Sequence, residues 1–201
     1  MLKTIALLTA LTAATPAFAQ FAPSTDLGKA EAGEYVLDRN HGRIIFSYTH
    51  LGYSTSYGLF TDFAAKLHFE PQDPTKSAVE VTINTNGIDT TVPRLDDMLK
   101  SPTYFDVATY PTASFKSTKL TVTGPTTGTM TGDLTVHGVT RPVTLDVTFN
   151  GAAPHPASKV FTMGFNATGQ VKRSEFGLGR SVPLVGDDVT LTISAEFDHT
   201  P

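Results

Sequence analysis

Apolar residues recur at every second position through most of the chain after Tyr35, with polar residues between them. A side-chain period of two is typical of a strand with one face in the core and the other in solvent. The pattern is clearest over residues 44–49, 63–69, 79–84, 113–115, 130–136, 143–149, 161–167 and 189–197. Gly, Pro, Asn and Asp separate these segments, as expected for turns between antiparallel strands. The chain is therefore predicted to be all-β.

Many strands that each have one apolar face are normally closed into a barrel or packed as a sandwich. Residues 132–151, GDLTVHGVTRPVTLDVTFNG, are predicted to form one hairpin with HGVTRP at its turn. Simple hairpin spacing of this kind favours an up-and-down barrel over a sandwich. Closure would also remove the free strand edges that pair with other chains.

Residues 91–106 break the period of two, because their apolar residues recur at helical spacing and a proline follows them. We predict a single short helix, Pro93–Lys100, with Thr90 or Thr91 as its N-cap.

Residues 1–19 have the three parts of a signal peptide. Lys3 gives a short positive region, an apolar run follows, and Ala17-Phe18-Ala19 forms a small-residue cleavage site. The apolar run is shorter than the roughly 20 residues of a spanning helix, which favours export over a membrane anchor. The predicted organisation is a signal peptide over 1–19 cleaved between Ala19 and Gln20, a flexible leader over 20–33 and one barrel domain over 34–201. We expect no integral membrane segment in the mature chain.

Charge and cysteine content narrow the function further. The formal net charge is −4, and it becomes −5 when Lys3, the only charge in residues 1–19, is removed with the signal peptide. No basic block is present, so nucleic acid is not an expected partner. The chain has no cysteine, which excludes disulfides, thiolate metal ligands and cysteine nucleophiles.

Motifs for catalysis or metal binding are weak. The histidines stand at positions 41, 50, 68, 137, 155 and 199, and no His-x-His pair places two ligands on one face of a strand. A metal site assembled across strands stays open. GIDTTV at 87–92 lacks the glycine of an Asp-Thr-Gly protease loop, and no Gly-x-Ser-x-Gly or phosphate-loop motif occurs. By elimination, the function is predicted to reside in the apolar interior.

The pattern alone does not decide whether that interior is filled. The predicted inward-facing phenylalanines are Phe46, Phe63, Phe69, Phe115, Phe149, Phe165 and Phe197. An eight-stranded barrel is either just filled by side chains or holds one small ligand. Inward-facing Ala65, Ala113, Ala167, Ala195 and Gly132 leave room, although small residues opposite large ones are also ordinary packing.

Four blocks of the sequence resemble the YceI-like family of periplasmic, lipocalin-like polyisoprenoid-binding proteins. The blocks are YVLDRNHGRIIFSYTHLGYSTSYGLFTDFAAKLHFEPQDPTKSAVEVTIN, LDDMLKSPTYFDVATYPTASFKSTKL, GDLTVHGVTRPVTLDVTFNG and VKRSEFGLG followed by VGDDVTLTISAEF. The resemblance implies an extended eight-stranded antiparallel up-and-down barrel with one short helix. It also implies a long apolar pore that holds an isoprenoid chain or a similar lipid, with no catalysis, no cofactor and no metal.

The resemblance and the inward faces together give a set of predicted ligand-binding residues. They are Phe46, Tyr48, His50, Phe60, Phe63, Phe69, Ile83, Met98, Leu99, Phe105, Phe115, Leu134, Val136, Leu145, Phe149, Phe165, Arg173 and Phe176. Arg173 is expected either to contact a lipid head group or to form an ion pair with Asp96, Asp97 or Glu175. The helix and the SPTYFD segment after it are expected at the barrel mouth, as a lid or as a fixed cap.

The sequence departs from the family pattern at the helix. Residues 95–99, LDDML, stand where the family commonly has Arg-Asp-x-His-Leu, so the mouth is less basic and more apolar. This favours a quinone, a free prenol or a fatty amide over a charged head group. Gly42 also replaces a common Ser, and Glu175 replaces the usual Asp.

We therefore expect an exported, periplasmic protein that binds a prenol, prenyl phosphate, isoprenoid quinone or similar lipid for transport, storage or sequestration. Three alternatives stay open. The protein could dock on a periplasmic or membrane redox system, act as a lipid-modifying enzyme through His50 or Asp89, or be a filled barrel without a ligand. A homodimer and a membrane redox partner are both compatible with the sequence.

Overall fold

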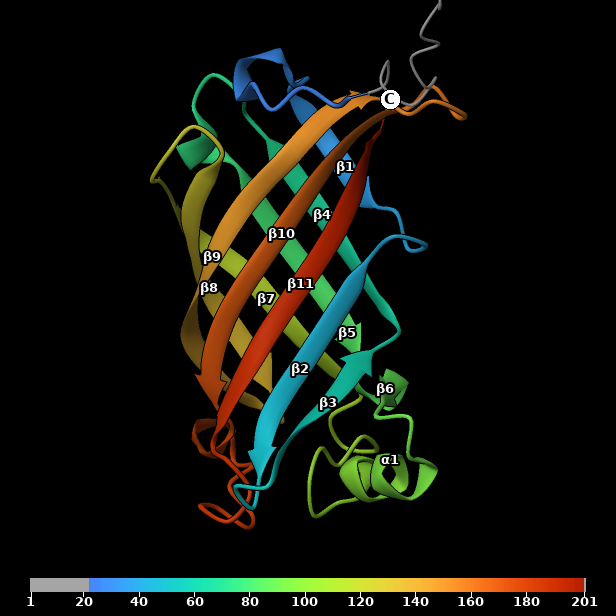
Figure 1. The fold of residues 1–201 in the computed structure, drawn as a ribbon, viewed down its shortest axis with the longest axis vertical. Coiled ribbons are helices and arrows are strands. Elements are labelled where there is room, and N and C mark those ends of the chain that lie inside the picture. The colour runs from blue at the N-terminus through green and yellow to red at the C-terminus, as the bar shows by residue number, and fades with distance from the viewer. Residues whose placement is uncertain (1–21, 201) are drawn as a thin grey trace, which may run out of the picture.

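A computed structural model describes residues 22–200, and the signal-peptide prediction lies outside these residues. Figure 1 shows long, tilted strands that wrap around a common axis. The strands are β1 Gly33–Leu37, β2 Arg43–His50, β3 Ser54–Phe60, β4 Phe63–Phe69, β5 Ala78–Asn84, β6 Ile88–Asp89, β7 Thr112–Val122, β8 Thr127–Val136, β9 Val139–Pro154, β10 Phe161–Lys172 and β11 Asp188–His199. The helices are α1 Pro93–Lys100 and the short 3₁₀ turns η2 Leu27–Lys29, η3 Pro74–Lys76, η4 Thr85–Gly87 and η5 Arg173–Phe176.

The strands form a closed antiparallel ring in the order β1, β4, β5, β7, β8, β9, β10 and β11, and β11 pairs back to β1. β1 and β2 lie end to end along β11, because β11 pairs with both of them at different heights. β4 and β3 continue each other in the same way, since they pair with β1 and β2 respectively. The predicted eight-stranded antiparallel barrel is therefore confirmed.

The predicted hairpin over 132–151 is formed by β8 and β9. Val136 pairs with Val139, so the turn consists of His137 and Gly138 alone. Both have positive φ, 51° and 73°, which gives a two-residue turn whose twist matches that of the strands. A Cβ at Gly138 would lie 2.6 Å from the Tyr110 ring, so glycine is required there for space as well as for conformation.

Helix α1 has the predicted bounds, but the predicted cap is wrong. The residue that precedes the helix is Val92, which has no side-chain capping bond, and Pro93 starts the first turn. Thr90 and Thr91 precede that position and therefore cannot cap the helix. Thr90 instead donates from its backbone N–H and its hydroxyl to Asp96 Oδ1, at 2.7 and 2.6 Å.

The described part of the expected flexible leader, residues 22–33, lies against one end of the barrel (Figure 1), and its last residue, Gly33, already begins β1. Ser24 exchanges two backbone hydrogen bonds with Ala152 of β9, both 2.9 Å long. Ala30 is buried, and the buried Tyr35 donates from its hydroxyl to the Glu31 carbonyl at 2.7 Å. This segment therefore contributes to the closure of the barrel end that it covers.

Candidate functional site

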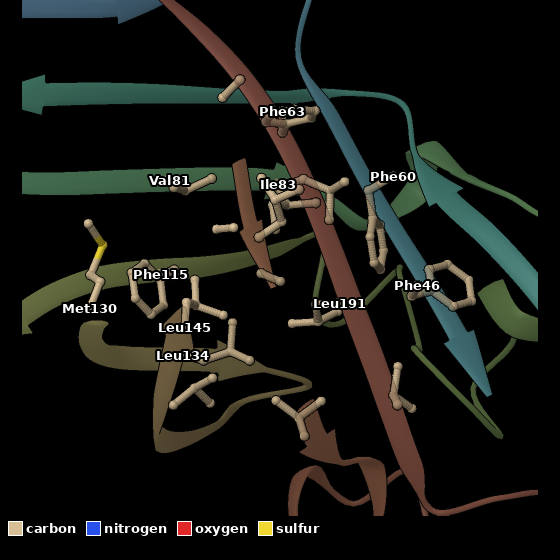
Figure 2. A pocket seen from close by; sticks show the side chains of 18 of the residues that line it. Phe46, Phe60, Phe63, Val81, Ile83, Phe115, Met130, Leu134, Leu145 and Leu191 are labelled. Carbon is tan, nitrogen blue, oxygen red and sulfur yellow. The ribbon is translucent and has the colours of Figure 1, made fainter. Parts of the chain in front are cut away.

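The barrel interior contains a cavity of ≈ 580 Å³. Side chains from every strand of the closed ring line it, and nearly all of the lining surface is apolar. Figure 2 shows labelled side chains from opposite walls that point into this space, among them Val81, Phe115, Leu134 and Leu191. The interior is thus an apolar chamber within the barrel.

Large side chains leave this space open because several of them lie over glycines of the adjacent strand. A Cβ at Gly58 would lie 2.3 Å from the ring of Phe46, and a Cβ at Gly132 would lie 2.4 Å from the ring of Phe115. The two rings therefore occupy the places of missing side chains on the wall. Gly132, predicted to leave room in the interior, provides it by accepting the Phe115 ring.

Several side chains on the inner face remain partly accessible. Val81, Met130 and Leu191 line the cavity and are only half-buried. In an interior packed at crystal-like density, side chains in these positions would have no accessible surface. The filled-barrel alternative therefore does not describe this structure.

One end of the cavity is bordered by α1, the β2–β3 turn and the loop over 177–187, and we call it the mouth end (lower end in Figure 1). Aromatic rings lead inward from it. Tyr48 stacks near Phe46 at 6.4 Å, Phe46 contacts Phe60 at 5.4 Å, and Phe60 meets Phe105 edge to face at 5.9 Å between centroids. Phe105 follows α1, so these contacts join the helical segment to the β2–β3 hairpin.

Arg173 organises the loop over 177–187. Its guanidinium donates to the carbonyls of Gly186, Val185 and Arg180 at 2.8, 2.8 and 2.9 Å, and also to that of Leu178. No ion pair to Asp96, Asp97 or Glu175 occurs within residues 22–200. The expectation of such a pair is wrong, because backbone carbonyls take up the donors of Arg173.

The charged side chains that line the described cavity are Arg173 and Arg180, both at the mouth end, and no Asp or Glu lines it. His50 and Ser181 also line this end. The loop is joined to the β2–β3 hairpin by backbone contacts between His50 and Val185 and by a 2.7 Å bond from Gly186 N–H to the Thr49 carbonyl. The charged groups that could meet a ligand's head therefore lie beside this loop, whereas the described part of the opposite end offers only the hydroxyls of Ser77, Thr126 and Thr127.

All of the predicted ligand-binding residues line the cavity, although their contact with a ligand remains a prediction. The lining also includes residues that the predicted set lacks: Val79, Val81, Met130, Val143, Val147, Leu191, Ile193, Leu27, Pro74, Arg180, Ser181 and Val185. The strand residues among these were marked by the same two-residue alternation. Those in the loops and 3₁₀ turns had no periodic signal.

The second candidate catalytic residue, Asp89, and the candidate metal-binding group lie outside the cavity. Asp89 does not line it, and its carboxylate accepts a hydrogen bond from Thr91 N–H at 2.7 Å. The sequence left open a metal site assembled across strands, and the structure brings Asp38, His41 and Glu196 together in one such group. His41 Nδ1 lies 2.6 Å from Asp38 Oδ2 and 3.8 Å from Glu196 Oε2, and the hydrogen bond with Asp38 is the main cause of the raised pKa of His41. These contacts fit a surface ion-pair cluster.

The fold and the site define a closed antiparallel β-barrel with a long apolar interior cavity. The YceI-like domain model matches residues 35–197, and the chain belongs to this family. Protein YceI of Salmonella arizonae is 37% identical over 171 residues, which cover 84% of this chain and 88% of that protein.

Solved structures agree with this assignment. Burkholderia cenocepacia BcnA matches with a TM-score of 0.71 and 25% identity, over 80% of this chain and 98% of that one. A polyisoprenoid binding domain from Saccharophagus degradans matches with a TM-score of 0.61 and 12% identity, over 85% of this chain and 100% of that one. At that identity the second likeness shows the fold alone.

Within residues 22–200, no helix has the length and apolar character needed to cross a membrane.

Proposed function

We propose that the protein binds a polyisoprenoid or a similar long-chain amphiphilic lipid inside the barrel, as a binding protein and not as an enzyme. The observation that carries this proposal is the long, almost wholly apolar cavity of ≈ 580 Å³. Its volume falls within the roughly 300–1,000 Å³ of ligand pockets. The polyisoprenoid binding domain from Saccharophagus degradans has the same fold, which is consistent with a lipid ligand here.

The chain of the lipid would lie along the barrel axis, with its head group at the mouth end. Inward-facing residues of β11 that line the cavity run from Val189 to Phe197. At about 3.4 Å per residue and a strand tilt of about 40°, this is a depth of roughly 20 Å. Arg180, His50 and Ser181 stand where the head would emerge, and the absence of acidic lining residues there favours a neutral or anionic head.

Affinity would come from chain length more than from any single contact. Large ligands realise about 0.3 kcal/mol per heavy atom, so about twenty carbons give roughly 6 kcal/mol, or a Kd of tens of micromolar. A longer prenyl chain that fills more of the cavity would bind more tightly. An isoprenoid quinone and a free prenol both meet these requirements.

We further propose that the protein acts in the periplasm after export through its N-terminal signal peptide. Enclosure of a prenyl chain in the barrel would shield it from water between membranes. Transport, storage and sequestration of such a lipid all use this property.

A pair of double variants tests the binding site. Val81 and Leu191 line the cavity and are half-buried, whereas their neighbours Thr82 and Thr192 point outward and are exposed. Val81→Phe with Leu191→Phe should weaken binding of a fluorescent prenol analogue by about tenfold or more, because about five ligand carbons lose their place at about 0.3 kcal/mol each. Thr82→Phe with Thr192→Phe is the matched control and should bind normally. Equal affinity in both double variants would contradict the proposed site.

A further inference from the structure

Exposed large apolar side chains gather at the mouth end. Leu51 and Tyr53 belong to the β2–β3 turn, Val182 and Leu184 to the loop over 177–187, and Met98 to α1. We call these five residues the mouth patch. Tyr53 is 88% exposed and Leu184 is 67% exposed. The three segments share the lower end of the barrel in Figure 1.

The opposite end of the barrel differs in character. Its connections are the β7–β8 turn, TGPTT over 123–127, the β9–β10 turn, HPASK over 155–159, and the polar η3 segment. Elsewhere among the described residues, the exposed large apolar side chains away from the mouth-end segments are Val36 on β1, Tyr57 on β3 and Val122 on β7. The apolar surface is therefore concentrated at the end where a cargo head group would emerge.

The two loops of the mouth patch form one surface. Leu51 N–H donates to the Leu184 carbonyl at 2.9 Å, which places the β2–β3 turn directly against the loop over 177–187. Leu51 has a φ of 51°, a left-handed conformation that Gly or Asn adopts more easily. The backbone conformation does not favour leucine at this position. Burial does not favour it either, because the side chain is 46% exposed. Contact of the Leu51 side chain with an apolar surface outside the protein would explain why leucine stands there.

The charges of the mouth end allow an approach to a lipid surface. Residues 50–53 carry no acidic group, and in the loop over 177–187 the positive charge of Arg180 is balanced by the negative charge of Asp187. Helix α1 contains two basic and two acidic residues, so its formal charges cancel. The formal charges of these three segments therefore cancel in a chain with a formal net charge of −4, so this end repels anionic lipids less than the rest of the surface does.

We propose that the mouth patch docks the protein on the surface of a phospholipid bilayer. Tyrosine and aliphatic side chains suit the boundary between head groups and acyl chains. In this orientation a lipid leaves the bilayer directly into the cavity without crossing water. The inference rests on the proposed function, because a membrane lipid as cargo is what links the cavity to a bilayer.

A single-tryptophan reporter tests the docking, since the chain contains no tryptophan. Tyr53→Trp places the probe in the mouth patch, and Val36→Trp, at a position 42% exposed on β1, is the control. Vesicles of phosphatidylcholine and phosphatidylglycerol should shift the emission of Tyr53→Trp to shorter wavelength and leave Val36→Trp unchanged. No shift in the first variant, or equal shifts in both, would overturn the proposal.

A second variant separates docking from cargo binding. Leu51 and Leu184 do not line the cavity, and asparagine tolerates the left-handed backbone at position 51. Leu51→Asn with Leu184→Ser should weaken vesicle binding by about tenfold or more. Its affinity for a prenol analogue offered in solution should stay unchanged, while uptake of that analogue from vesicles slows.

The outcomes distinguish this inference from the proposed function. A wild-type protein that binds the prenol analogue but does not float with vesicles overturns the docking and leaves lipid binding intact. Vesicle binding that depends on the mouth patch, without any uptake of prenol, supports the docking and contradicts the proposed function. A concentration-dependent dimer that Leu51→Asn with Leu184→Ser abolishes, without vesicle binding, would assign the patch to self-association and overturn the proposal.

Discussion

Phe46 on β2 pairs directly with Gly58 on β3, and its ring covers the position that a side chain at 58 would occupy. On β7 and β8, Phe115 pairs with Leu134, and its ring covers the position of a side chain at the diagonal neighbour Gly132. Each phenylalanine thereby contributes its apolar surface to the wall and takes little of the lumen. The volume left for a ligand depends on these individual residue pairs.

Gly58→Ala should destabilise the barrel by about 1–3 kcal/mol, because the new Cβ would lie 2.3 Å from the Phe46 ring and force it into the cavity. The measurement is urea unfolding followed by circular dichroism. Adding Phe46→Leu should restore part of the loss, since the three atoms nearest to the added Cβ all belong to that ring.

Gly164→Ala is the control for this prediction, because the nearest atom to its added Cβ is 3.6 Å away. We expect a change within about 0.5 kcal/mol. Equal destabilisation at both glycines would show that the Phe46 contact does not set the cost.

His68 predicts a pH dependence of stability. Its Nδ1 lies 2.6 Å from Glu34 Oε1 and its Nε2 lies 3.3 Å from Glu70 Oε1. The hydrogen bond with Glu34 is the main cause of the raised pKa of His68, and the charges of both glutamates also raise it. The stabilisation is complete below the ordinary pKa of about 6.5 and is lost as pH rises through the raised folded-state pKa.

Thermal unfolding of His68→Gln and the wild type across this range checks the sign. The wild type should be the more stable protein at pH 6, by less than about 1 kcal/mol because the group is exposed. The difference should shrink toward pH 8. A difference that grows with pH would refute the assigned ion pairs.

At the scale of elements, Arg173 makes more side-chain hydrogen bonds to the loop over 177–187 than any other residue does. Arg173 donates to four of its carbonyls, while Ser174 donates from its backbone N–H and hydroxyl to the Asp187 carboxylate at 2.8 and 2.7 Å. These side-chain bonds, together with the backbone bonds to the β2–β3 hairpin, fix this irregular segment at the mouth end. The loop in turn holds the position of Arg180 and Ser181 beside the cavity.

Arg173→Lys should destabilise the protein by about 1–3 kcal/mol, because an ammonium cannot satisfy all of these carbonyls. Amide hydrogen exchange should increase in residues 177–187 and stay unchanged in β8 and β9. Arg180→Lys is the control, and it should leave exchange in the loop as it is. Faster exchange throughout the barrel in Arg173→Lys would mean that the residue supports the whole fold.

The regular elements were predictable, and the reasons are local. The alternation of apolar and polar residues places Val143, Leu145 and Val147 on one face of a strand without any knowledge of the neighbouring strands. Residues 93–100 have helical spacing of apolar residues and no two-residue alternation, so they predict a helix. The role of Arg173 was not predictable, because its carbonyl partners lie in a loop without periodicity. The space that the Phe46 ring leaves free in the cavity was also not predictable. It depends on the strand register that places Gly58 opposite Phe46.

At the scale of the whole molecule, closure gives the barrel its stability and the cavity its isolation from solvent. Backbone pairing continues around the ring, so the wall has few free edges and its inner face can be apolar along its whole length. The leader covers one end, while α1 and the loop over 177–187 border the other. Under the proposed function, the mouth-end segments are where entry of a lipid would be controlled.

The most direct test of this account is native mass spectrometry of the protein, purified without detergent, followed by lipid analysis of an organic extract. We expect a stoichiometric prenyl or similar long-chain species, whose mass also identifies the head group. A bare polypeptide mass, in a protein that also fails to take up added prenol and quinone, would contradict lipid binding in the cavity.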